Sequence, residues 1–122
     1  MTTTVILPMA QYPAGTYTMP STAVPLNIGT VKVAVDRTLW TDPAVTVDAR
    51  MVWSFDGGTV WSPGGGWTAN GGTMFLRDGT TVSTESFASF VMPQASNPNR
   101  KIRGSVVVAG GTVTSSVSLT TS

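Results

Sequence analysis

The feature that most restricts the fold is a strict alternation of apolar and polar residues between positions 44 and 55. One phase holds Val45, Val47, Ala49, Met51, Trp53 and Phe55. The other phase holds Thr46, Asp48, Arg50 and Ser54. A period of two places alternate side chains on opposite faces of an extended chain. We therefore expect a long strand here, with one buried face and one face in water.

The rest of the chain has the same character. Thr, Ser, Val and Gly dominate, whereas the straight-chain residues that favour helices are scarce. Val31, Val33 and Val35 share one phase, and residues 87–92 form another short apolar run. About eight short strands separated by turn residues predict an all-β fold, an antiparallel β-sandwich of jelly-roll type without helices.

Glycine-containing turns suggest how some of these strands connect. Gly110 and Gly111 predict a two-residue hairpin that pairs Val108 with Val113 and Val106 with Ser115. A second hairpin is expected at residues 77–80, with Phe75 opposite Val82, and a third around residues 56–58. Residues 62–66, which are rich in glycine, are expected to form a loop.

The first 25 residues form a segment of their own, because four prolines interrupt them at positions 8, 13, 20 and 25. We expect an extended, irregular N-terminal arm at residues 1–25 and a single β-sandwich domain at residues 26–122. One interpretation is an edge strand with loops packed on the sandwich. The other is an arm that reaches a neighbouring subunit, because Val5-Ile6-Leu7 is apolar enough to extend a foreign sheet.

Composition excludes several kinds of chemistry. The 122 residues include neither cysteine nor histidine, so disulfides, thiolate nucleophiles, Cys/His zinc sites and a histidine general base are absent. The formal net charge is only +1, which disfavours nucleic acid and anionic membranes as partners. No run of residues has the length and hydropathy of a membrane span. We expect no cofactor and no metal.

Catalysis would have to use carboxylates, and a pair of them for glycoside hydrolysis is the mechanism that this composition permits. The acidic residues are Asp36, Asp42, Asp48, Asp56, Asp78 and Glu85. Their positions at turns or on the polar face of a strand are explained without a catalytic role. We therefore expect that the protein is not an enzyme.

A short motif follows the long strand. Ser54, Asp56, Gly58 and Trp61 match the S-x-D-x-G-x-T-W hairpin called the Asp-box, although Val60 replaces its usual threonine. The Asp-box stabilises a turn, because its carboxylate accepts backbone N–H groups and its tryptophan packs beneath. It therefore implies no sialidase activity.

Residues 45–61 resemble a stretch found in galactose-binding-like jelly rolls and in small β-sandwich proteins of tailed phages. The resemblance implies a virion structural protein that decorates the capsid or forms part of the tail or its fibres. We expect the decoration or cement type, on the capsid surface, which stabilises the shell through protein contacts. Its partners would be capsid or other virion proteins, and it would form a homo-oligomer such as a trimer. The residues expected to make these contacts are Val5, Ile6, Leu7, Tyr12, Tyr17, Trp40 and Trp67.

The tryptophans support an alternative function, a carbohydrate-binding module or tail-fibre receptor-binding domain, because an exposed indole stacks on a sugar ring. Trp40 and Trp67 are expected at loop tips, where either could bind a glycan, whereas Trp53 and Trp61 are expected in the core. Arg100, Lys101 and Arg103 form a local basic cluster, which we interpret as a solvated strand entrance.

Overall fold

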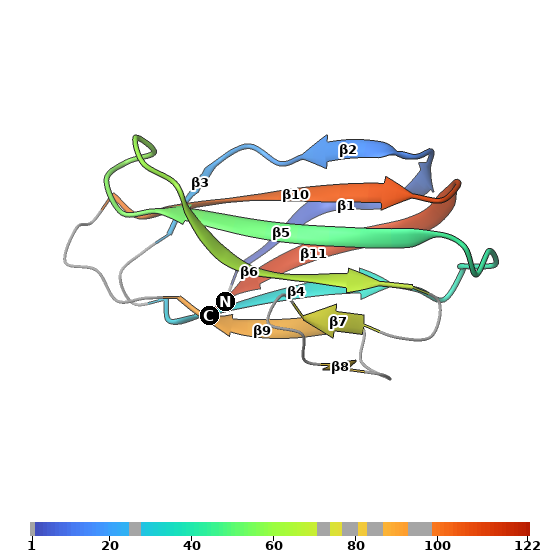
Figure 1. Cartoon of the computed structure of the whole chain (residues 1–122). Coiled ribbons are helices and arrows are strands. Elements are labelled where there is room, and N and C mark those ends of the chain that lie inside the picture. The colour runs from blue at the N-terminus through green and yellow to red at the C-terminus, as the bar shows by residue number, and fades with distance from the viewer. Residues whose placement is uncertain (1, 25–27, 71–73, 77–80, 83–86, 93–98) are drawn as a thin grey trace.

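The computed structural model describes residues 2–24, 28–70, 74–76, 81–82, 87–92 and 99–122. In these residues the chain forms two antiparallel sheets and no helix (Figure 1). The predicted all-β sandwich is therefore confirmed. No helix in the described ranges has the length and apolar character needed to cross a membrane.

Sheet A has four strands in the order β1-β11-β4-β9. Their bounds are Thr2–Tyr12 for β1, Val113–Thr121 for β11, Thr30–Asp36 for β4 and Phe87–Val91 for β9. The first and last strands of the chain are thus neighbours, and Thr2 pairs with Thr121.

Sheet B has seven strands, in the order β2-β10-β5-β6-β7-β8, with β3 also pairing with β10. The outer strands on one side are β2 (Gly15–Thr18) and β3 (Thr22–Ala23), next to β10 (Lys101–Ala109). The others are β5 (Thr46–Ser54), β6 (Ser62–Ala69), β7 (Met74–Leu76) and β8 (Thr81–Val82).

The strand order is that of a jelly roll. If β2 and β3 count as one edge and β7 and β8 as an addition, about eight strands remain, as in the two Greek keys of that fold. Successive strands then cross repeatedly from one sheet to the other, as β1 to β2, β4 to β5 and β10 to β11 do. Figure 1 shows the two layers, with β10 and β5 in front of β11 and β4.

Alternation places the core between the sheets. Val47, Ala49, Met51 and Trp53 of β5 are buried, as is the valine phase of β4, which confirms both predicted strands. These inward faces meet because each would otherwise expose a row of apolar side chains to water.

The predicted hairpin at Gly110 and Gly111 is wrong in its pairing. Both glycines have positive φ, 84° and 150°, as such a turn requires, but β10 belongs to sheet B and β11 to sheet A. Val108 pairs with Val47, and Val113 pairs with Tyr12. The turn is an arch between layers, so the apolar faces of β10 and β11 meet across the core instead of lying side by side.

Of the other predicted turns, the hairpin around residues 56–58 is confirmed, since β5 pairs with β6 and Gly57 and Gly58 have positive φ. The loop predicted at residues 62–66 is wrong, because these residues begin β6. Phe75 lies opposite Thr81, one residue from the predicted Val82. The turn at residues 77–80 lies outside the described residues.

Three strands come from the proline-containing N-terminal segment. β1 is 11 residues long despite Pro8, which falls in one of two register irregularities against β11. A proline is tolerated on an edge strand at such an irregularity, because no ladder hydrogen bond from its nitrogen is needed there. Residues 2–24 thus lie against the sheets of their own chain, as in the first interpretation of this segment.

Candidate functional site

The predicted contact residues in β1 do not share one surface. Val5 is 54% exposed, whereas Ile6 and Leu7 are buried in the core. The register against β11 shifts between Val5 and Leu7, so two consecutive residues turn inward. Ile6 and Leu7 therefore hold β1 in its own sandwich and are not available to extend a foreign sheet.

Tyr12 and Tyr17 are also used within the chain. Their rings meet edge to face with centroids 5.1 Å apart. The Tyr12 hydroxyl donates to the Pro8 carbonyl at 2.5 Å, and the Tyr17 hydroxyl donates to the Pro13 carbonyl at 2.6 Å. These contacts fix the connection between β1 and β2, and both rings remain half-buried.

The two tryptophans expected at loop tips have different positions. Trp40 lies between β4 and β5 and is half-buried against the core. The expectation for Trp67 is wrong, because it lies in β6, is 0% exposed, and donates from Nε1 to the Val33 carbonyl of sheet A at 3.2 Å. Since its alternation phase points inward, Trp67 ties the two sheets together and offers no platform for a glycan.

The Asp-box-like hairpin has the geometry that its sequence predicts. Asp56 Oδ1 accepts hydrogen bonds from the amides of Val60 and Thr59, at 3.0 and 3.1 Å, and from the Ser54 hydroxyl at 2.7 Å. The hydrogen bond from the Val60 amide, followed by that from Ser54, lowers the pKa of Asp56 below its ordinary value. The carboxylate therefore organises the turn that carries Trp61.

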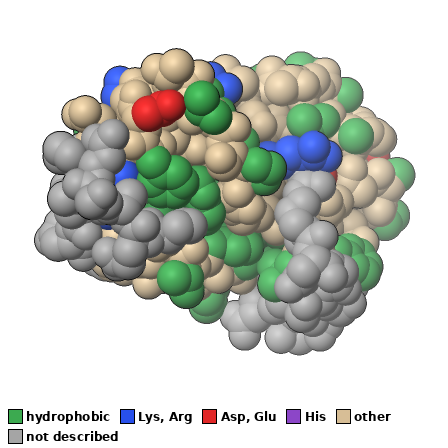
Figure 2. Space-filling view, turned by 60° about the vertical axis from the view of Figure 1, so that its left-hand side comes forward, with side chains coloured by type: hydrophobic (Ala, Val, Ile, Leu, Met, Phe, Trp, Pro, Cys, Tyr) green, Lys and Arg blue, Asp and Glu red, His purple; other side chains and the backbone are tan. Residues whose placement is uncertain are grey.

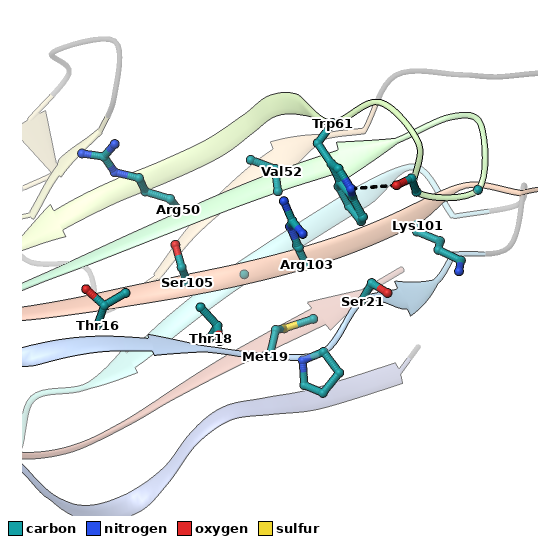
Figure 3. A pocket seen from close by; sticks show the side chains of 14 residues that line it. Thr16, Thr18, Met19, Ser21, Arg50, Val52, Trp61, Lys101, Arg103 and Ser105 are labelled. Atoms are coloured by element: carbon teal, nitrogen blue, oxygen red, sulfur yellow. Dashed lines mark hydrogen bonds between the residues drawn. The ribbon is translucent and has the colours of Figure 1, made fainter.

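Beside this hairpin, a groove of about 780 Å³ runs over the outer face of sheet B. Figure 3 shows it crossing β10 and β5, between the hairpin and the chain that follows β2. The basic side chains that line it are Arg50, Lys101 and Arg103, and the hydroxyl-bearing ones are Thr16, Thr18, Ser21 and Ser105. No carboxylate is among the lining residues.

Trp61 and Arg103 form the centre of the groove. The Arg103 guanidinium lies over the Trp61 ring, 4.2 Å from its centroid, and the Trp61 Nε1–H donates to the Gly58 carbonyl at 3.1 Å (Figure 3). Trp61 was expected in the core and is instead half-buried here. Cation–π stacking holds an exposed guanidinium in a fixed place, which suits recognition of an anion.

The three residues of the predicted basic cluster, Arg100, Lys101 and Arg103, do not share one environment. Arg103 is exposed and Lys101 is half-buried, but Arg100 is 0% exposed and donates from Nη2 to the Ile28 carbonyl at 2.9 Å. The interpretation as a solvated entrance is therefore wrong for Arg100. The sequence shows the charge of Arg100 but not its burial, because a buried arginine is identified by the groups to which it hydrogen-bonds.

A second surface is the outer face of sheet A. The register places Val5, Ser118, Ala34 and Phe87 in one row across the strands, from one edge of the sheet to the other. Small side chains thus lie at the centre of this row, while exposed apolar side chains lie at the edges of the sheet, with Val5 54%, Phe87 39% and Val91 81% exposed. Lys32 adds a cation, with its Nζ 4.3 Å from the Phe87 ring centroid.

The carboxylates needed for the hydrolase hypothesis serve local roles where they are described. Asp36 accepts from Thr38, Asp42 from the Ala44 amide, and Asp48 from Arg50 and Thr68. Within the described ranges no three acidic side chains gather in a group that could hold a metal. Asp78 and Glu85 lie outside the described ranges.

Sequence reasoning missed the groove although part of the signal was present. Arg50 and Arg103 both occupy the polar phase of their strands, but the sequence did not show that β5 and β10 are neighbours. Comparison with models of known protein families gives no match, and comparison with curated proteins gives none.

Proposed function

We propose that the chain is a non-enzymatic structural protein of a tailed-phage virion. It lies on the capsid surface, decorates it, and stabilises the shell through contacts with capsid proteins. The resemblance of residues 45–61 to small β-sandwich proteins of such phages supports this proposal. The observation that carries it is the outer face of sheet A, with its small central side chains and its exposed apolar edges.

This face suits a protein partner. Small side chains such as Ser118 and Ala34 allow the partner's surface to approach the sheet closely, and Val5, Phe87 and Val91 supply apolar area at the periphery. Burying such area contributes about 25 cal/mol per Å². A protein that binds only the assembled shell shifts the equilibrium toward assembly.

Self-association is part of the proposal. Copies bound to a symmetric shell occupy equivalent positions, and a closed oligomer such as a trimer fits a lattice position of the same symmetry. Capsid or other virion proteins remain the proposed partners. Nucleic acid and membranes are not among the proposed partners.

The test uses particles of the virus that encodes the chain, stripped of the protein and then incubated with recombinant variants. Val5→Lys combined with Val91→Lys places charges at both edges of the sheet A face. We expect the amount of this variant that sediments with particles to fall at least about tenfold, because each buried apolar contact is replaced by a charge that must be desolvated.

The matched control is Val60→Lys, which changes a valine of intermediate exposure on the Asp-box-like hairpin, 61% against 54% for Val5 and 81% for Val91. It should bind particles as the unmodified protein does. The proposal fails if the unmodified protein does not bind particles, or if the double variant binds as well as the control. Thermal unfolding of each variant verifies that it is folded.

A further inference from the structure

The groove on sheet B is independent of the proposed capsid contact, because it lies on the opposite layer of the sandwich. Its lining contains three cationic side chains and no acidic one. A concave surface with this charge favours an anionic ligand, since its positive potential is concentrated by the surrounding protein.

The cations belong to neighbouring strands and share one face. Arg50 pairs with Ser105, and Arg103 pairs with Val52, so the two arginines start two rungs apart on the β5–β10 ladder and point to the same face of the sheet. Figure 3 shows Arg103 between Arg50 and Lys101 along the groove. An extended ligand that follows β10 would therefore meet positive charge repeatedly.

Two of these side chains are oriented before any ligand arrives. Arg103 stacks on Trp61, which the hairpin fixes through Gly58. The Nε–H of Arg50 donates to Asp48 Oδ1 at 3.1 Å while its side chain stays 62% exposed. Fixed guanidinium groups lose less conformational entropy when they bind, so more of the interaction contributes to affinity.

The hydroxyl groups that line the groove indicate which type of anion it binds. Thr16, Thr18 and Ser105 occupy adjacent outward positions of β2 and β10, and Ser21 follows them along the groove edge. Such groups exchange hydrogen bonds with the hydroxyls of a sugar. Figure 2 shows Lys and Arg side chains separated from one another by polar and hydrophobic ones. The formal net charge of only +1 also disfavours a nucleic-acid backbone as the ligand.

We propose that this groove binds an acidic saccharide. Arg50 and Arg103 bind the carboxylates of successive sugars, Lys101 supplies further positive charge, and the Ser and Thr hydroxyls bind the sugar hydroxyls. Trp61 acts as a positioning residue for Arg103. The site differs from the one expected at Trp40 and Trp67, and it does not depend on the proposed place in a virion.

The test measures binding of trigalacturonate by titration calorimetry, with its methyl ester as a probe of the same sugars without charge. We expect the acid to bind at least about tenfold more tightly than the ester, because charge-assisted hydrogen bonds are the stronger kind. Arg103→Met, which keeps an unbranched apolar side chain and removes the guanidinium, should weaken binding of the acid by about tenfold or more.

The matched control is Lys32→Met, which removes an exposed cation that also lies over an aromatic ring, but on sheet A. It should leave binding unchanged. The proposal is overturned if the acid does not bind, if acid and ester bind equally, or if Lys32→Met and Arg103→Met weaken binding alike. Equal affinity for an oligothymidylate of the same charge would also overturn it, by showing a general attraction to polyanions.

Discussion

Asp56 shows how one carboxylate connects a turn to a binding surface. It accepts three hydrogen bonds within the hairpin and so fixes the position of Trp61, on which Arg103 stacks. The Asp56 carboxylate is exposed to solvent. It stabilises the hairpin through the hydrogen bonds that it accepts. A change at this residue should therefore affect both stability and the groove.

The pKa of Asp56 gives a prediction about pH. Because the folded protein holds this pKa below the ordinary value of 3.8, the ionised form stabilises the fold above that value. This contribution is lost as the pH falls from about 3.8 through the lower folded pKa. Asp56→Asn should therefore lower the free energy of unfolding at neutral pH and make its decline in acid shallower.

Urea denaturation between about pH 2.5 and pH 7 measures both effects. Part of the decline should persist in the variant, because hydrogen bonds from Thr38 also lower the pKa of Asp36. If Asp56→Asn and the unmodified protein declined with the same slope, Asp56 would not contribute in the way described.

Among the strands, Gly65 near the start of β6 allows the two sheets to approach closely. A Cβ on Gly65 would clash with the Phe90 ring of β9, in the opposite sheet. A Cβ on Gly64 would lie 2.8 Å from the Met51 carbonyl oxygen of β5, in the same sheet, where the register of β5 and β6 shifts. Phe90 therefore packs directly on the backbone of the opposite sheet. The glycine-rich stretch at the start of β6 is therefore packed against sheet A.

Gly65→Ala should destabilise the protein by about 1–3 kcal/mol, because the added methyl group overpacks this contact. Phe90→Ala removes the ring, so Gly65→Ala should cost much less in that background. A double-mutant cycle from urea denaturation measures this coupling. Additive effects of the two substitutions would contradict direct packing of Phe90 on Gly65.

The strands were predictable from sequence, because the alternation of apolar and polar residues is a local pattern. Which strands pair with one another was not predictable. The phases of β4 and β5 are those expected from sequence. The turn at Gly110 and Gly111 looked like a hairpin because an inward apolar face is compatible with a partner beside it or across the core. A local pattern does not distinguish these two arrangements.

The same limit applies to the site. Asp56 was predictable as a turn residue, because its hydrogen-bond partners lie within four residues of it in the sequence. Arg103 and Arg50 meet only through the pairing of β10 with β5, and Arg100 is buried by a contact to Ile28 that is 72 residues away. Long-range pairings of this kind set which polar side chains become a surface and which become part of the core.

At the scale of the whole molecule, β11 is a central strand although it is last in the chain. It lies between β1 and β4, and Val113, Val117 and Leu119 are buried. Removing residues 113–122 should therefore abolish cooperative unfolding, as measured by circular dichroism during urea denaturation, because β1 loses its partner and the core loses one wall.

A circular permutant tests whether this loss reflects the missing strand. Opening the chain between Gly110 and Gly111 and joining the paired ends of β11 and β1 with a short flexible linker keeps every strand. It should unfold cooperatively, as the unmodified protein does. A truncated chain that stayed folded would contradict the central role of β11.

The pairing of β1 with β11 also determines when the protein can fold. During synthesis, β1 leaves the ribosome before the other described strands, and its neighbour β11 follows only after all of them. Contacts between residues so distant in sequence slow folding, because a long loop must close before they form. In the permutant the same two strands become a local hairpin, so the search for the native state should be shorter and refolding faster.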